Sequence, residues 1–235
     1  MAASSSRMPP ALRADARHNR DRILEAARAL FAARGLDVPM AAVARRAGVG
    51  VATLYRRFPT RESLVTTVFA DQLRTCAGTV DEALADPDPW AGFCGVVEKV
   101  CAMNVLDRGF AAAFLTAFPD AADFEATRVR AEEGFAVLTR RAKEAGRLRA
   151  DFDRSDLTLV FMANNGINAP STRAALAASR RLVALLLHSF RADVAGPDGA
   201  GAPLPPRRPW TCTTFRGPGP APETGAAGAV SRPGA

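Results

Sequence analysis

The stretch ARRAGVGVATLYRRFPTRESL, residues 44–64, constrains the possible folds more than any other part of this sequence. Apolar residues recur at helical spacing on both sides of Gly48. Glycine adopts a positive φ without steric cost, so Gly48 permits a sharp turn between two helices. Ala44 and Ala47 precede the turn, and their small side chains let the two helix backbones approach closely. The pattern predicts a helix-turn-helix.

The second helix of this motif has few side chains that need burial. We expect Leu54 and Phe58 to pack inward against the preceding helix. The remaining side chains are predicted to point outward and to contact DNA: Val51, Ala52, Thr53, Tyr55, Arg56 and Arg57. A half-buried packing role is the alternative for Tyr55. Arg45, on the first helix, is either a solvated residue or a phosphate contact.

The rest of the chain has the pattern of helices separated by Gly, Pro and Asp clusters. Ala-rich segments with few β-branched or aromatic residues favour helix over strand. Thr60 is expected to cap a long helix, with Ser63 where a capping box usually has Glu. The expected helices cover residues 17–34, 40–47, 51–58, a longer segment from near 60, 89–106, 108–117, 121–146, 153–168 and 171–191.

These segments predict an all-α fold in which a three-helix, helix-turn-helix DNA-binding head precedes a helical-bundle body. We expect the head to span residues 15–62 and the body residues 63–192. Residues 1–14 are rich in Ala, Ser and Pro, and residues 193–235 in Gly, Pro and Ala, so we expect a flexible arm and a disordered tail. The tail is either solvated, or one of its two large aromatic residues, Trp210 and Phe215, docks on the body or binds a partner.

Positive charge is concentrated at the start of the chain. The first 80 residues contain 13 Arg, no Lys and six acidic residues, whereas basic and acidic residues balance over the remainder. The net charge of +7 therefore lies in the first third, which predicts a polyanionic partner there. Arginine also suits two-point contacts with phosphates and base edges.

Several function classes lack the residues that they need. The sequence has no GxSxG motif, no Walker-type loop and two widely separated histidines, so an enzyme is disfavoured. The four cysteines form no CxxC pair and lie near no His, so we expect no metal, cofactor or disulfide. No apolar run reaches about 18 residues, which predicts a cytoplasmic protein without membrane contact.

The segment RDRILEAARALFAARGLDVPMAAVARRAGVGVATLYRRFPTRESL, residues 20–64, resembles the N-terminal domain of the TetR family of bacterial transcriptional regulators, and the resemblance covers residues 17–64. The signature is an Ala-Gly-Val turn, then Thr-Leu-Tyr, an apolar ring, and a basic residue followed by Glu or Asp. The resemblance implies that Thr53 and Tyr55 contact DNA at the start of the recognition helix. It also implies that Arg57 touches the DNA backbone and that Arg61 binds a phosphate.

Two places depart from the family pattern. Gly50 and Val51 stand where many members have Ser or Thr followed by Lys or Gln, so a capping hydroxyl and a polar base contact are missing. Pro39 stands where the family often has Ser or Thr as the cap of the preceding helix. Asp37 is the candidate replacement for that cap.

The resemblance further implies a homodimer, joined through its last two helices, whose body encloses a pocket for a small-molecule effector. Residues 182–190 carry apolar side chains on more than one helix stripe, which indicates burial on more than one side. The apolar pocket candidates would equally fill a core, and the two asparagines equally suit a helix end or a dimer contact. The candidates are Phe93, Val97, Cys101, Phe114, Phe118, Phe135, Phe161, Asn164 and Asn165.

These observations predict a sequence-specific DNA-binding transcriptional regulator, a repressor whose partners are double-stranded DNA, a second copy of the chain and an unknown effector. One alternative is a DNA-binding regulator that acts through a protein partner bound by the C-terminal tail. A helical enzyme is the other.

Overall fold

The computed structural model describes residues 10–116 and 118–195, which form an all-α fold. Within these residues β pairing is limited to one bridge, between Leu148 and Arg191. The helices are α1 Pro10–Arg34, α2 Met40–Ala47, α3 Val51–Arg57, α4 Arg61–Ala85, α5 Pro89–Leu106, α6 Arg108–Phe114, α7 Ala122–Glu144, α8 Arg154–Asn165, α9 Thr172–Phe190 and the 3-10 helix η1 Ala192–Ala195.

The predicted helices are confirmed, with shifts at several ends. α1 begins at Pro10, within the segment expected to be a flexible arm. η1 continues to Ala195, three residues into the expected tail. The rest of the predicted tail, including Trp210 and Phe215, and residues 1–9 of the predicted arm lie outside the described residues.

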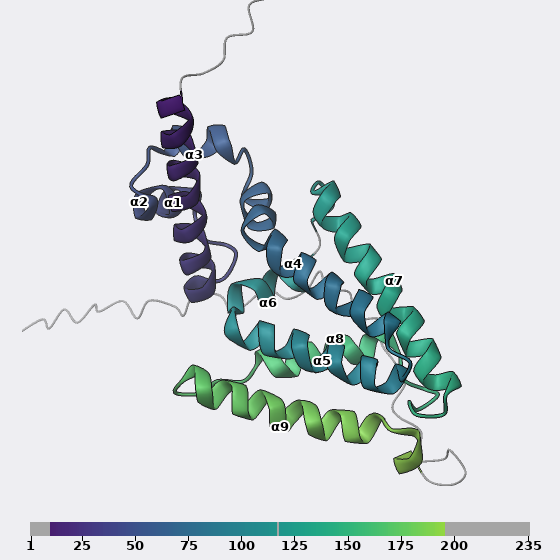
Figure 1. Cartoon of the computed structure of the whole chain (residues 1–235). Coiled ribbons are helices and arrows are strands. Elements are labelled where there is room, and N and C mark those ends of the chain that lie inside the picture. Colours follow the sequence, from purple (N-terminus) through teal and green to yellow (C-terminus); the bar gives the residue numbers. More distant parts are fainter. Residues whose placement is uncertain (1–9, 117, 196–235) are drawn as a thin grey trace, which may run out of the picture.

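Figure 1 shows how the helices are arranged. α1, α2 and α3 lie together at one end, and α4 runs from them into the body. α5 and α7 both pack along α4, while α9 packs along the opposite side of α5. None of the described helices is both long enough and apolar enough to cross a membrane.

The turn between α2 and α3 follows the sequence prediction. Gly48 ends α2 in the left-handed region, with φ 64° and ψ 36°. Its amide donates to the Arg45 carbonyl at 3.2 Å, and the Val49 amide donates to the Ala44 carbonyl at 3.0 Å, so carbonyls at the helix end are satisfied. Arg22 of α1 donates to the Gly48 carbonyl at 3.4 Å and braces the turn against α1.

The start of α4 is capped as predicted, whereas the start of α2 is not. The Ser63 amide donates to Thr60 Oγ1 at 3.0 Å and the Thr60 amide donates to Ser63 Oγ at 3.3 Å, which confirms the capping box. The proposed replacement cap at Asp37 is wrong. Pro39 precedes α2 without a side-chain cap, and the Asp37 carboxylate instead accepts a hydrogen bond from Arg61 at 3.2 Å.

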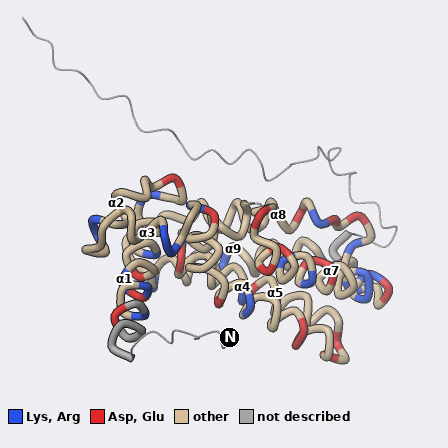
Figure 2. The backbone as a smooth tube through the Cα atoms, turned by 90° about the horizontal axis from the view of Figure 1, so that it is seen from above, with Lys and Arg blue, Asp and Glu red and all other residues tan. Residues whose placement is uncertain are grey.

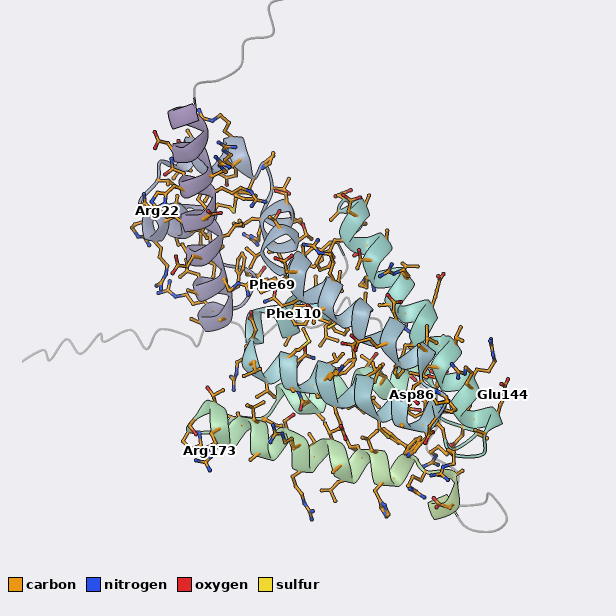
Figure 3. The ribbon with its side chains drawn as sticks, viewed as in Figure 1. Arg22, Phe69, Asp86, Phe110, Glu144 and Arg173 are labelled. Atoms are coloured by element: carbon orange, nitrogen blue, oxygen red, sulfur yellow. The ribbon has the colours of Figure 1, made fainter. Side chains whose placement is uncertain are left out.

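Aromatic packing attaches α1 to the body. Phe31 of α1 and Phe69 of α4 have ring centroids 6.1 Å apart, and Phe69 lies at the same distance from Phe110 of α6. All three side chains are almost fully buried. Figure 3 shows Phe69 and Phe110 beside each other where α4 and α6 meet.

Arg28 joins the same three helices through polar contacts. It donates to the Val68 carbonyl at 2.6 Å and to Gln72 Oε1 at 3.2 Å, both on α4. Its guanidinium also lies 3.6 Å from the Asp107 carboxylate, which accepts a hydrogen bond from Gln72 at 3.1 Å. Asp107 caps α6 as well, because its Oδ1 accepts from the Phe110 amide at 3.0 Å. These contacts fix α1 relative to α4 and α6.

We expect Gly48→Ala to lower the free energy of unfolding by about 1–2 kcal/mol, because a residue with a Cβ is strained at this positive φ. The added Cβ would also collide with Arg22 Nη2. Gly78→Ala is the matched control, since Gly78 lies within α4 and an added Cβ meets no neighbouring group within 4 Å. It should stabilise the fold by about 0.5–1 kcal/mol. Urea denaturation measures both changes, and a shift in the same direction for both would contradict the account of the turn.

Candidate nucleic-acid interface and body cavity

α3 buries one side and exposes the others. Leu54 is fully buried, whereas Tyr55 is 47% exposed and Val51 is 43% exposed although both side chains are large. Because successive residues turn by about 100° around a helix, the exposed side chains cover α3 except on the Leu54 side. No side chain caps the start of α3, where Gly50 is the N-cap residue. The other predicted contact residues of α3 are exposed or partly exposed: Ala52, Thr53, Arg56 and Arg57.

Two further predicted contact residues lie on the neighbouring helices. Arg45 is exposed near the end of α2. Arg61 opens α4 and forms an ion pair with Asp37, whose side chain is 94% exposed. An ion pair this exposed contributes only about 0–1 kcal/mol, so Arg61 can exchange Asp37 for another anion. The positive end of the α4 dipole lies at the same place and also favours an anion.

The charges of the fold are distributed unevenly. Figure 2 shows Lys and Arg recurring along α1, α2 and α3, whereas basic and acidic residues alternate over the body. The exposed face of α3 therefore lies on the part of the molecule where these basic residues of α1, α2 and α3 are found. A surface with this combination attracts a polyanion.

The body contains a cavity of about 130 Å³, which we call the body cavity, between α4, α5, α6, α7 and α8. Its polar wall consists of Arg128, Glu132, Arg154 and Thr158. The rest of the wall is apolar and consists of Leu73, Cys76, Val80, Val96, Val100, Phe114, Leu115, Ala131, Phe135, Leu157 and Phe161.

Three of the predicted pocket residues line the body cavity, and six do not. Those that line it are Phe114, Phe135 and Phe161. Those that do not are Phe93, Val97, Cys101, Phe118, Asn164 and Asn165. Aromatic packing explains two of these absences: the Phe93 ring stacks on Trp90 at a centroid distance of 5.6 Å, and the Phe118 ring lies 5.6 Å from that of Phe124.

Asn164 joins helices instead of lining the cavity. It is fully buried, and its Nδ2 donates to the Cys101 carbonyl of α5 at 2.9 Å. Its Oδ1 accepts from the Ser179 hydroxyl of α9 at 2.6 Å. Asn165, the next residue, is partly buried, and its Oδ1 has no hydrogen-bond partner. Asn164 therefore satisfies polar groups of α5 and α9 inside an apolar body.

None of the residues on the polar wall of the body cavity was predicted from the sequence. Arg128 donates to Glu125 at 2.8 Å and to Glu132 at 2.8 Å, both on its own helix α7. Arg154 of α8 lies 2.5 Å from Glu132. The spacing of Glu125, Arg128 and Glu132 indicates ion pairs on one helix face, but it does not reveal that α8 and a cavity lie beside them.

A larger and more polar groove, of about 590 Å³, lies between α1, α4 and α7. Its walls include Arg20, Asp71, Arg74 and Asp123, and Arg74 forms an ion pair with Asp71. Charged side chains that water reaches are poor partners for an apolar molecule. The smaller body cavity, with its apolar wall, is therefore the better candidate for a small organic ligand.

Two family models match most of the described helices. Residues 23–68 match the model of bacterial regulatory proteins of the tetR family. Residues 88–192 match that of the SbtR-like transcriptional regulator C-terminal domain. No curated protein sequence is significantly similar to the chain.

Solved structures of transcriptional regulators are also similar to this chain. A TetR transcription regulatory protein from Mycobacterium vanbaalenii is 32% identical over 77% of this chain and 99% of that one, with a TM-score of 0.41. A TetR transcriptional regulator from Streptomyces coelicolor is 29% identical over 73% and 98%, with a TM-score of 0.44. The ketosteroid transcriptional regulator KstR2 of Mycobacterium tuberculosis is 19% identical over 73% and 94%, and its TM-score of 0.56 supports the fold.

We expect Asn164→Ala to lower the free energy of unfolding by about 1–3 kcal/mol, because it removes a buried hydrogen bond to the Cys101 carbonyl and takes away the Asn164 partner of the buried Ser179 hydroxyl. Asn165→Ala is the control and should change the free energy by no more than about 0.5 kcal/mol. Chemical denaturation at one fixed protein concentration compares the two variants. Equal losses would show that Asn164 has no special structural role.

Proposed function

The chain belongs to the TetR family of bacterial transcriptional regulators, and on that premise we propose that it is a ligand-responsive repressor that binds its operator as a homodimer. The observation that carries the proposal is the exposed face of α3, beside the start of α4 and within the most basic part of the chain. We assign DNA binding to residues 15–62 and ligand binding with dimerisation to residues 63–192. The repressor acts in the cytoplasm, where its DNA is.

We assign the reading of base edges to the first turn and a half of α3. Thr53 and Tyr55 have hydroxyl groups that donate and accept hydrogen bonds, as base edges in the major groove require. Val51 and Ala52 are exposed and provide apolar contacts for thymine methyl groups. A helix of this length enters the major groove with its N-terminal residues toward the bases.

Arginines on three helices are assigned to the phosphates. Arg56 and Arg57 end α3, Arg45 lies on α2, and Arg61 begins α4. Contacts with phosphates fix the register of the protein on the duplex, and they release counterions. We therefore expect the affinity for DNA to fall steeply with salt, with a log–log slope of about −0.9 for each phosphate contacted.

Exposed apolar residues on α8 and α9 support the homodimer. Leu185 is 54% exposed on α9 and Leu159 is 45% exposed on α8. The buried residues of α9 are Ser179, Val183 and Leu187, on one stripe, so within a single chain the apolar surface of the helix is only partly covered. A second copy of the chain, seated on α8 and α9, would cover the remainder.

Contacts through α6 support a response of the head to a ligand in the body cavity. Phe114 and Phe161 line the cavity with ring centroids 5.4 Å apart. Phe114 lies 5.7 Å from Phe110, which is also in the chain of aromatic contacts that reaches Phe31 of α1. A ligand that displaces Phe114 would therefore shift α6, and with it the contact between α6 and α1. In a homodimer this change alters the spacing of the two α3 helices, so that only one state fits the operator.

We expect Tyr55→Ala to abolish the preference for operator DNA over a scrambled duplex, because a mismatched base contact costs about 1–3 kcal/mol. Arg57→Ala should weaken binding to both duplexes and reduce the magnitude of the salt slope by about 1. Fluorescence anisotropy with the DNA upstream of the gene, at several salt concentrations, measures both effects.

Arg140→Ala is the control for a general loss of positive charge. The Arg140 side chain is 67% exposed on α7 and lies 3.7 Å from Glu144, which Figure 3 shows at the end of α7 remote from α3. This variant should bind DNA like the wild type. If it weakens binding as much as Arg57→Ala does, the assignment of the phosphate contacts to the head is wrong.

We expect Leu185→Glu to raise the dissociation constant of the dimer at least about tenfold, because a buried unpaired carboxylate costs several kcal/mol. Val129→Glu is the matched control, since Val129 is an apolar residue of α7 with 43% exposure. Sedimentation velocity over a range of concentrations measures the change. A monomeric wild type, or equal effects of the two substitutions, would contradict dimerisation through α9.

A further inference from the structure

The size of the body cavity restricts its ligand. Its volume is about 130 Å³, and an apolar protein cavity of about 150 Å³ accommodates benzene. Phe114, Phe135 and Phe161 contribute three aromatic rings to the wall, and the first and third are nearly perpendicular, at 87°. Walls of this kind suit the edges and faces of one flat ring.

The charges on the polar wall already have partners. Arg128 donates to Glu125 through Nε at 2.8 Å and to Glu132 through Nη1 at 2.8 Å. Arg154 contacts the other oxygen of Glu132 at 2.5 Å. The two guanidinium groups thus pair with two carboxylates, Glu132 on the wall and Glu125 beside it, and these four charges sum to zero. A ligand with a carboxylate would have to displace Glu125 or Glu132, so a charged ligand is disfavoured.

One uncharged polar group on the wall remains available. Thr158 of α8 is partly buried, and its hydroxyl makes no hydrogen bond with any residue that the structure describes. A hydroxyl donates one hydrogen bond and accepts others. A ligand with a hydroxyl or carbonyl group would therefore find a partner beside the aromatic rings.

Covalent capture at the cavity is disfavoured. Cys76 lines the wall, but burial raises the pKa of its thiol to about 12. The thiolate is the reactive form of cysteine, so a thiol with this pKa is inert near neutral pH. Its Sγ also packs 3.8 Å from Met103 Sδ. The cavity is therefore built for reversible binding.

We infer that the body cavity binds a small uncharged molecule of single-ring size that carries one hydroxyl or carbonyl group, which bonds to Thr158. This inference rests on the proposed function in that it names the chemical class of the effector. It excludes carboxylates and long acyl chains from this cavity as it stands in the structure.

Calorimetric titration of the full chain with benzyl alcohol, benzoate and toluene tests the inference. Benzyl alcohol and benzoate share a ring with a one-carbon substituent, and near neutral pH only benzoate is charged. We expect benzyl alcohol to bind at least about tenfold more tightly than benzoate. Equal or tighter binding of benzoate would overturn the inference, because it would mean that Arg128 or Arg154 accepts an anion.

Two pairs of measurements locate the binding. Ala131→Leu fills the cavity from α7 and should lower the affinity for benzyl alcohol at least about tenfold. Ala136→Leu, at an exposed position of the same helix, should leave this affinity unchanged. Thr158→Val should lower the affinity for benzyl alcohol about fivefold and leave the affinity for toluene unchanged. Retained toluene binding shows that this variant is folded. If Ala131→Leu has no effect, the ligand binds elsewhere and the inference is overturned.

The same samples separate this inference from the proposed function. Protein that binds operator DNA but none of the three probes would overturn the inference and leave the assignment of a DNA-binding repressor in place. Protein that binds benzyl alcohol in the Ala131-lined cavity but does not release DNA would support the inference and contradict the proposed response to a ligand.

Discussion

The orientation of α3, the helix proposed to read DNA, depends on the joint where α1 meets α4 and α6. Phe31, Phe69 and Phe110 fill this joint, and Arg28 spans it through polar contacts on both sides. The backbones also approach closely there, since a Cβ on Gly109 of α6 would lie 2.9 Å from the Phe69 ring and 3.1 Å from a backbone nitrogen of α1. The positions of α2 and α3 depend on α1, because Arg22 of α1 donates a hydrogen bond to the Gly48 carbonyl in the turn between them.

α6 belongs to two environments at once, which gives it a central place in the proposed response. Its C-terminal residue, Phe114, lines the body cavity, while Asp107 and Gly109 at its other end touch the joint. The helix spans only seven residues. A packed core does not deform continuously, so a ligand against Phe114 is expected to move α6 as a unit.

Local patterns in the sequence predicted the helices and the head. Which residues line the cavity depends instead on packing between residues far apart in the sequence. The turn at Gly48 and the Thr60 cap depend on residues a few positions apart, and both are present. The pocket residues of the body were harder to predict, because an apolar residue such as Phe93 suits a core and a cavity wall equally. Asn164 bonds to a carbonyl 63 residues earlier, which no local pattern contains. The cap expected at Asp37 failed for the same reason, since its carboxylate meets Arg61 instead.

Selection of bound duplexes from a random DNA pool by the full chain tests the central claim most directly, that a homodimer reads sequence through α3. The account predicts an enriched inverted repeat whose half-sites lie about 10 base pairs apart, or a multiple of that spacing. It also predicts that the Tyr55→Ala protein enriches no such repeat. Retention of DNA without enrichment of any sequence by the wild-type chain would contradict the account.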